Sequence, residues 1–128
     1  MRLVFSWLQD SEFIFPLCTS DSSCKGEVSA VSCLLMDDGG RRHLSTIPWI
    51  DEGMRRIIAV KNLEVEHAYW IREAWGAEIK HNRAKIYSLH DESYFEEIGS
   101  HELMLVLEAW KEFLRAGVQL GMQKKIEI

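Results

Sequence analysis

The chain has 128 residues, a mass of 14.9 kDa and a formal charge of −5 at pH 7. This length suits one domain, so residues 1–128 are expected to form a single α+β unit. Hydrophobic residues make up 47% and charged residues 27%, a composition typical of folded proteins rather than disordered ones. Non-specific nucleic-acid binders need clustered positive charge, so the negative balance argues against a nucleic acid as partner.

The three cysteines, Cys18, Cys24 and Cys33, do not have the number or spacing of a disulfide framework or a zinc site. A bridge between Cys18 and Cys24 across a turn is the less favoured alternative to three free thiols in a reducing compartment. The N-terminal apolar stretch is interrupted by Gln9 and Asp10 and lacks the features of a signal peptide. No run approaches the ~18 apolar residues of a membrane span, so we expect a cytoplasmic protein without a membrane partner.

Apolar, β-branched and aromatic runs predict four strands in the first third of the chain, separated by a polar loop over 19–25 and a glycine turn over 37–40. Pro16 places the second of them at a sheet edge. The expected strands cover residues 3–8, 12–18, 27–36 and 41–44.

Helical spacing of apolar residues predicts helices over 48–62 and 100–116, the second with Ser100 as N-cap. Strict alternation predicts one long strand over 69–80 that bends near Gly76, then a turn and a returning strand over 84–89. A short final strand is expected over 125–128. This order predicts an α+β fold, a mostly antiparallel sheet with the two main helices packed on one face in two layers.

Acidic residues are concentrated in one stretch, on the predicted loop before the last helix and along the polar face of that helix. Residues 91–112 contain one basic residue, Lys111, and seven acids, so this stretch carries a charge of −6 and the rest of the chain sums to +1. A field of one sign steers a basic partner, although a solvated helix face is an equally good interpretation. The acids are Asp91, Glu92, Glu96, Glu97, Glu102, Glu108 and Glu112.

Other residues suggest weaker alternatives. His90, Asp91 and Glu92, with His101 nearby, are residue types of acid–base catalysis, but no established metal or catalytic spacing is present. A basic hairpin tip over 80–85 is more typical of a solvated turn than of a nucleic-acid site. Trp70 and Tyr94 are candidate apolar anchors for a protein partner, since aromatic residues carry much interface energy, with burial in the core as the default for Trp70.

Residues 70–77 (WIREAWGA), 86–95 (IYSLHDESYF) and 107–114 (LEAWKEFL) resemble small cytosolic immunity proteins. These are encoded beside bacterial polymorphic and contact-dependent growth-inhibition toxins. The resemblance spans 68–114, a little over a third of the chain, and residues 1–67 add nothing to it. It implies a stoichiometric inhibitor rather than an enzyme, without a cofactor or metal. The implied partner is the C-terminal domain of a cognate toxin, often a nuclease with a basic groove.

Two alternatives to an immunity protein stay open. One is a cytosolic adaptor that binds a protein unrelated to any toxin, and the other is a small enzyme or ligand-binding domain with a pocket at 90–92. The sequence does not distinguish the first alternative from immunity, because both depend on the same surface physics. It also leaves the oligomeric state open.

Overall fold

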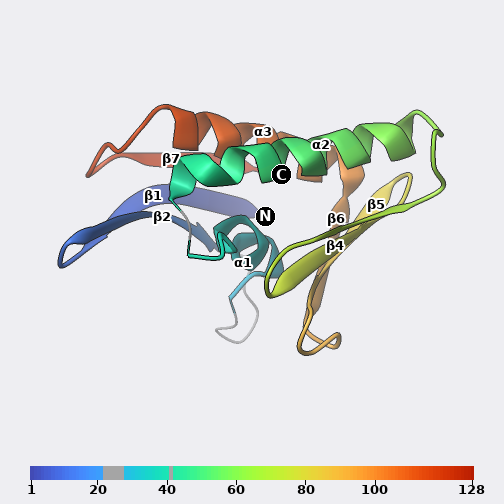
Figure 1. Ribbon diagram of the computed structural model, residues 1–128, viewed down its shortest axis with the longest axis horizontal. Helices are drawn as coiled ribbons and strands as arrows, with labels where there is room; N and C mark the ends of the chain where they lie inside the picture. Colours follow the sequence, from blue (N-terminus) through green and yellow to red (C-terminus); the bar gives the residue numbers. More distant parts are fainter. Residues whose placement is uncertain (22–27, 41) are drawn as a thin grey trace.

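The computed structural model describes residues 1–21, 28–40 and 42–128, and it confirms the α+β fold with antiparallel pairing. The strands of the described chain form two sheets rather than one, and a third helix joins the two expected ones. Helices α2 and α3 lie side by side above both sheets, and the short helix α1 lies between the sheets on the other side (Figure 1).

The first sheet, here called sheet A, has the strand order β2-β1-β7. Strands β1 (Arg2–Asp10) and β2 (Phe13–Ser20) form a hairpin, and β7 (Gln123–Glu127) pairs with the other side of β1. All three strands were expected, and the prediction that Pro16 marks an edge strand is confirmed. Alternate side chains of β1 enter the core, because successive residues of a strand point to opposite faces. The buried set is Leu3, Phe5 and Trp7.

The second sheet, here called sheet B, contains β3 (Ala68–Ile71), β4 (Trp75–Ile79), β5 (Arg83–Ser88) and β6 (Phe95–Gly99) in that order. The prediction of one long strand over 69–80 is wrong, because the chain reverses between β3 and β4. The carboxylate of Asp37 accepts hydrogen bonds from the amides of Ala74 and Trp75, at 2.9 and 3.0 Å. Strand β6 was expected to be a loop.

Residues 30–36 form the helix α1 (Ala30–Met36), so the strand expected over 27–36 is wrong. One side of this helix is buried and carries Val31, Leu34 and Leu35. Their spacing is typical of a helix, but it also fits the apolar run of a buried strand. The strand expected over 41–44 is also wrong. Residues 43–46 form the 3-10 helix η2 (His43–Thr46), in which the Thr46 hydroxyl donates to the carbonyl of His43. The predicted loop over 19–25 falls partly on β2 and otherwise mostly outside the described residues.

The two main helices, α2 (Ile47–Lys61) and α3 (Ser100–Arg115), are confirmed. The N-cap of α3 is Gly99 rather than Ser100. A Cβ added to Gly53 of α2 would lie 2.6 Å from the ring of Trp70, so the helix approaches sheet B closely only because this residue is glycine. Lys111 of α3 forms an ion pair with Asp51 of α2, at 2.6 Å.

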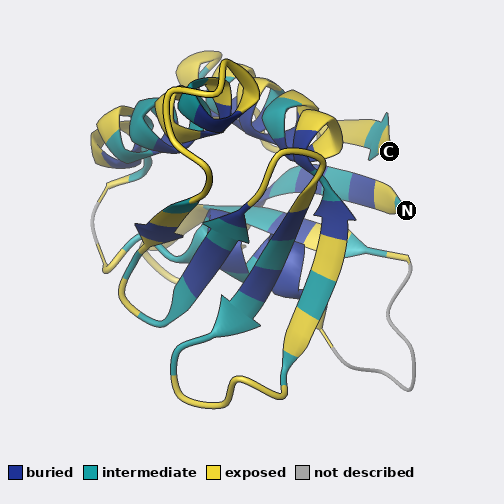
Figure 2. Ribbon diagram, turned by 90° about the vertical axis from the view of Figure 1, so that its right-hand side faces the viewer, coloured by how far each residue is buried: buried dark blue, intermediate teal, exposed yellow. Residues whose placement is uncertain are grey.

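Buried side chains from both sheets and from all three α-helices form one hydrophobic cluster. Aromatic contacts connect sheet A to α3, with ring centroids 4.8 Å apart for Phe5 and Trp110 and 5.1 Å apart for Trp7 and Phe113. The buried side chains of sheet B lie on its inner face, and Figure 2 turns its other face toward the viewer. Among the described residues, no helix is both long and apolar enough to span a bilayer.

Candidate protein-binding surface

The acidic stretch does not form one surface, and the prediction that it does is wrong. Asp91 and Glu92 lie in the loop between β5 and β6, whereas Glu108 and Glu112 lie on α3 at the opposite side of the molecule (Figure 1). The five residues of β6 separate the two groups by roughly 17 Å, at about 3.3 Å per residue. The strand formed by residues 95–99 therefore distributes charges that are contiguous in sequence over different faces.

Several of these acids have structural partners instead of facing an empty surface. Glu96 points to the inner face of sheet B, where its carboxylate accepts hydrogen bonds from the Ser29 hydroxyl (2.6 Å) and the Val31 amide (3.2 Å). Glu102 accepts weakly from the Gly99 amide at the start of α3. The carboxylate of Glu96 therefore has a structural role at the N-terminus of α1, and its predicted contact with a partner stays a prediction.

The remaining acids have weaker local partners. Glu97 lies 3.4 Å from Arg83, and Glu112 lies 3.7 Å from Lys124. Asp91 accepts from the hydroxyl and amide of Ser93, which lowers the pKa of its carboxyl. These side chains are exposed, and exposed ion pairs contribute little to stability. They remain accessible to a partner.

Neither predicted aromatic anchor is free. Trp70 is only 1% exposed and stacks on Trp49, with centroids 4.2 Å apart, so its predicted role as a surface anchor is wrong and the core alternative is confirmed. Tyr94 is half-buried with its ring against Trp75, and its hydroxyl donates to the carbonyl of Val28. Tyr94 is therefore part of the packing between sheet B and the segment before α1.

The open face of sheet B carries a row of apolar and aromatic side chains that sequence analysis missed. Strand register places Ile71, Gly76, Tyr87 and Phe95 side by side across all four strands. Ile71 is 52% and Phe95 49% exposed. A Cβ on Gly76 would lie 3.3 Å from the ring of Tyr87, so the aromatic ring lies over the glycine. This apolar row runs across the sheet face that Figure 2 turns toward the viewer.

A second row on the same face carries charges of both signs. It places Tyr69, Glu78, Lys85 and Glu97 side by side. The hydroxyl of Tyr69 donates to Glu78 at 2.8 Å, which lowers the pKa of the carboxyl and raises the pKa of the phenol. The Lys85 ammonium lies 4.6 Å from the centre of the Phe95 ring, within cation–π range.

Carboxylates of this second row form ion pairs with two bases of the hairpin tip over 80–85. Lys80 lies 3.6 Å from Glu78, and Arg83 pairs with Glu97. A bound phosphate backbone would have to displace both carboxylates, so the nucleic-acid alternative at this hairpin finds no support in the geometry. The two rows together form a mixed apolar and charged face, the composition that protein interfaces have.

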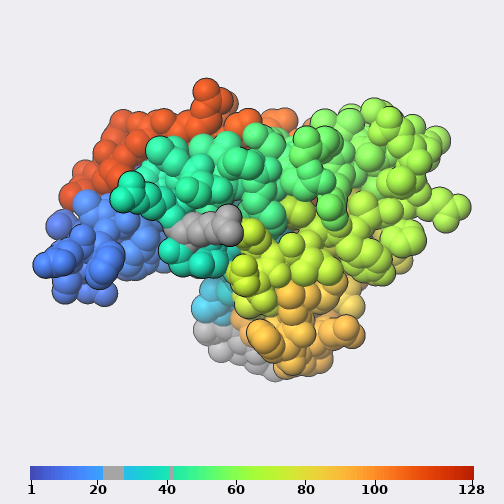
Figure 3. Space-filling model, viewed as in Figure 1, coloured from blue at the N-terminus to red at the C-terminus, as the bar shows by residue number. Residues whose placement is uncertain are grey.

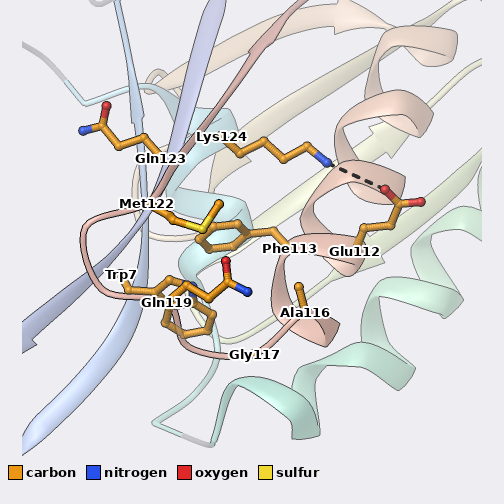
Figure 4. A pocket seen from close by; sticks show the side chains of 9 residues that line it. All are labelled: Trp7, Glu112, Phe113, Ala116, Gly117, Gln119, Met122, Gln123 and Lys124. Atoms are coloured by element: carbon orange, nitrogen blue, oxygen red, sulfur yellow. Dashed lines mark ion pairs between the residues drawn. The ribbon is translucent and has the colours of Figure 1, made fainter.

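Three pockets lie on the described part of the chain, and His81 and His101 line one of them, between α2 and the start of α3. The pocket in Figure 4 has a volume of about 270 Å³, with Trp7, Phe113 and Met122 around it and the Glu112–Lys124 ion pair at its rim. The other two, of about 460 and 560 Å³, lie beside α3 and η2. Residues 90–92 line none of these three pockets. Within the described ranges, no group of His, Cys, Asp and Glu is arranged to hold a metal ion.

The described thiols are unreactive by environment. Cys18 is buried and hydrogen-bonded to Ser32 at 3.3 Å, and burial raises its pKa to about 11. Burial also raises the pKa of half-buried Cys33, which lies in α1 rather than in the expected strand. Both are free cysteines, and a nucleophilic thiol needs the opposite shift. Cys24, with its suggested bridge, lies outside the described residues.

Comparison of the chain with protein-family models, with curated proteins and with solved structures finds no match.

Proposed function

We propose that the chain is a stoichiometric protein-binding domain, and specifically an immunity protein that neutralises the C-terminal domain of a cognate toxin, most simply a nuclease. The open face of sheet B is the proposed binding surface. This proposal rests mainly on the apolar row of this face, formed by Ile71, Tyr87 and Phe95. A half-exposed row of this kind, bordered by charges, has the anatomy of an interface centre with a polar rim.

Acidic side chains at the border of this face support a basic partner. Asp91 and Glu92 lie in the loop that joins the strands carrying Tyr87 and Phe95. Burial, followed by the nearby charges of Glu78 and Glu92, raises the pKa of Tyr87, which places Glu92 close to the apolar row. A rim charge of this sign accelerates encounter with a basic surface. Six of the seven acids, all except Glu96, thus keep exposed positions without forming the single patch expected from sequence.

The immunity role rests on the resemblance of residues 68–114, and the adaptor alternative would use the same face. The gene neighbourhood separates the two. We expect a large open reading frame directly upstream, whose C-terminal domain kills cells unless this chain is co-expressed. An isolated gene, or an upstream domain without toxicity, would overturn the toxin partner while leaving the binding surface to be tested.

The binding surface is tested by calorimetric titration of that purified domain with Ile71→Asp and Phe95→Asp variants. Leu105→Asp is the matched control, because Leu105 is 42% exposed on α3, away from this face. We expect each sheet B variant to weaken 1:1 binding by at least tenfold, which corresponds to about 1.4 kcal/mol, and the control to bind normally. Binding that tolerates both substitutions would show that the surface lies elsewhere.

A further inference from the structure

A pocket that the proposed function does not use lies where three elements meet. Its lining comes from the end of α2, the turn between β4 and β5, and the start of α3. In the space-filling view the β1–β2 hairpin forms one end of the molecule, and the end of α2 with the strands of sheet B lies toward the other (Figure 3). The pocket has a volume of about 460 Å³, which is in the range of small-molecule sites.

Hydrogen bonds hold the turn between β4 and β5 against the start of α3. The Ser100 amide donates to the carbonyl of Asn82 at 3.1 Å, and the Ser100 hydroxyl donates to the carbonyl of Lys80 at 2.7 Å. Because His81 lies between these two carbonyls in the chain, both bonds fix it beside the first turn of α3, which carries His101. The walls of the pocket are therefore set by the packing of the turn on the helix.

The apolar part of the lining comes from both main helices. Ile57 of α2 is 3% exposed, and Ile58 beside it is 45% exposed. Met104 of α3 is half-buried and completes this wall. A cavity of about 150 Å³ is enough for one benzene molecule. The larger volume here accommodates a ring or a short alkyl chain together with a polar head.

The polar part of the lining contains hydrogen-bond donors and no acid, although the chain has twenty acids. These donors are an ammonium, two imidazoles and an amide, from Lys61, His81, His101 and Asn82. Within residues 1–21, 28–40 and 42–128, none of these four side chains has a hydrogen bond or an ion pair. Glu102, the acid next in sequence, lies with its carboxylate 3.4 Å from the Gly99 amide and does not line the pocket.

We propose that this pocket binds a small organic anion, with a phosphate or carboxylate head among Lys61, His81 and His101 and an apolar body against Ile57 and Met104. Lysine donates three N–H groups, and an imidazole donates at least one in either protonation state. Hydrogen bonds between charged donors and anionic oxygens are among the strong ones. A chain of net charge −5 repels anions over most of its surface, so a lining without acids is what such a ligand requires.

The test is an NMR titration of the full chain, in which the amide signals report both affinity and location. Phenyl phosphate carries the proposed head and body, and for about 11 non-hydrogen atoms we expect a Kd of about 0.1–1 mM. The shifts should be confined to amides of the lining. Inorganic phosphate and benzyl alcohol, which carry only the head or only the body, should each bind at least about tenfold more weakly. Phenylacetate compares the two heads, since the tighter of the two ligands identifies the natural head group.

Substitutions separate a site from a general effect of charge. Lys61→Gln should weaken the binding of phenyl phosphate by at least about fivefold, and His101→Ala by at least about threefold. Lys125→Gln is the matched control, because it makes the same change of charge at an exposed position of β7, and it should bind normally. The amide spectrum of each variant shows whether the variant is folded.

Three results would overturn the proposal: no saturable shift up to about 10 mM ligand, inorganic phosphate binding as tightly as phenyl phosphate, or equal loss in the two lysine variants. The apolar row of sheet B does not line this pocket. A failure here would therefore leave the proposed function to its own test.

Discussion

The carboxylate of Glu96 fastens α1 to sheet B, and its removal should destabilise the protein more than the removal of any exposed acid. It accepts hydrogen bonds from Ser29 and from the Val31 amide in the first turn of α1. A hydrogen bond to a charged group contributes about 1.5–3 kcal/mol, and loss of an N-terminal cap costs about 0.5–2 kcal/mol. These two values describe the same interaction and are not added together. We therefore expect Glu96→Ala to lower the free energy of unfolding by about 2–3 kcal/mol.

The assay is urea unfolding followed by tryptophan fluorescence, supported by a thermal melt in which the Tm should fall by roughly 10 °C. Glu97→Ala is the matched control. Its residue is the next one on β6 but lies on the open face in an exposed ion pair, so it should cost at most about 1 kcal/mol. Equal stability of the two variants would refute the assignment of Glu96 to the N-terminus of α1. Glu96→Gln should fall between them, since an amide oxygen still accepts.

Three further predictions follow from individual contacts. Gly53→Ala should destabilise the protein by about 1–3 kcal/mol despite the higher helix propensity of alanine, because the new Cβ would meet the Trp70 ring; an unchanged or raised Tm would contradict this. The hydrogen bond from Tyr69 lowers the pKa of Glu78 from 4.5, so the pair contributes stability above that pH and loses it as the pH falls below. Tyr69→Phe should therefore lose less stability on acidification than the wild type, and identical pH profiles from chemical unfolding would count against the pairing. Cys18, with its pKa of about 11, should resist alkylation in native buffer at pH 8 and react in urea, as measured by mass spectrometry; rapid native labelling would show that it is accessible.

The sequence predicted those elements whose pattern is local and unambiguous. The β1–β2 hairpin strands, α2, α3 and β7 were all expected from alternation or helical spacing. The prediction of a strand over 27–36 was wrong because the spacing of Val31, Leu34 and Leu35 fits both a buried strand and a helix. The carboxylate of Glu96, more than sixty residues later in the chain, accepts a hydrogen bond from the first turn of the helix, and local spacing cannot reveal such a contact.

The candidate site was harder to predict than the fold. Counting acids over 91–112 placed Glu96 and Glu112 on one surface, whereas strand β6 turns Glu96 toward the core and α3 carries Glu112 to another face. The apolar row of Ile71, Tyr87 and Phe95 joins three separate strands. Its signal in the sequence was the alternation in each strand, but its continuity depends on register.

The sequence by itself determined the α+β class, the two main helices, the edge position of Pro16 and the net acidity, because each depends on residue types and their spacing along one segment. The tertiary structure alone decided where the chain reverses at residues 72–74, that the strands divide into two sheets, and which acids remain exposed. These outcomes depend on hydrogen bonds and packing between residues far apart in the chain, such as Asp37 with Trp75 and Gly53 with Trp70. The spacing of residues along one segment does not predict such long-range contacts.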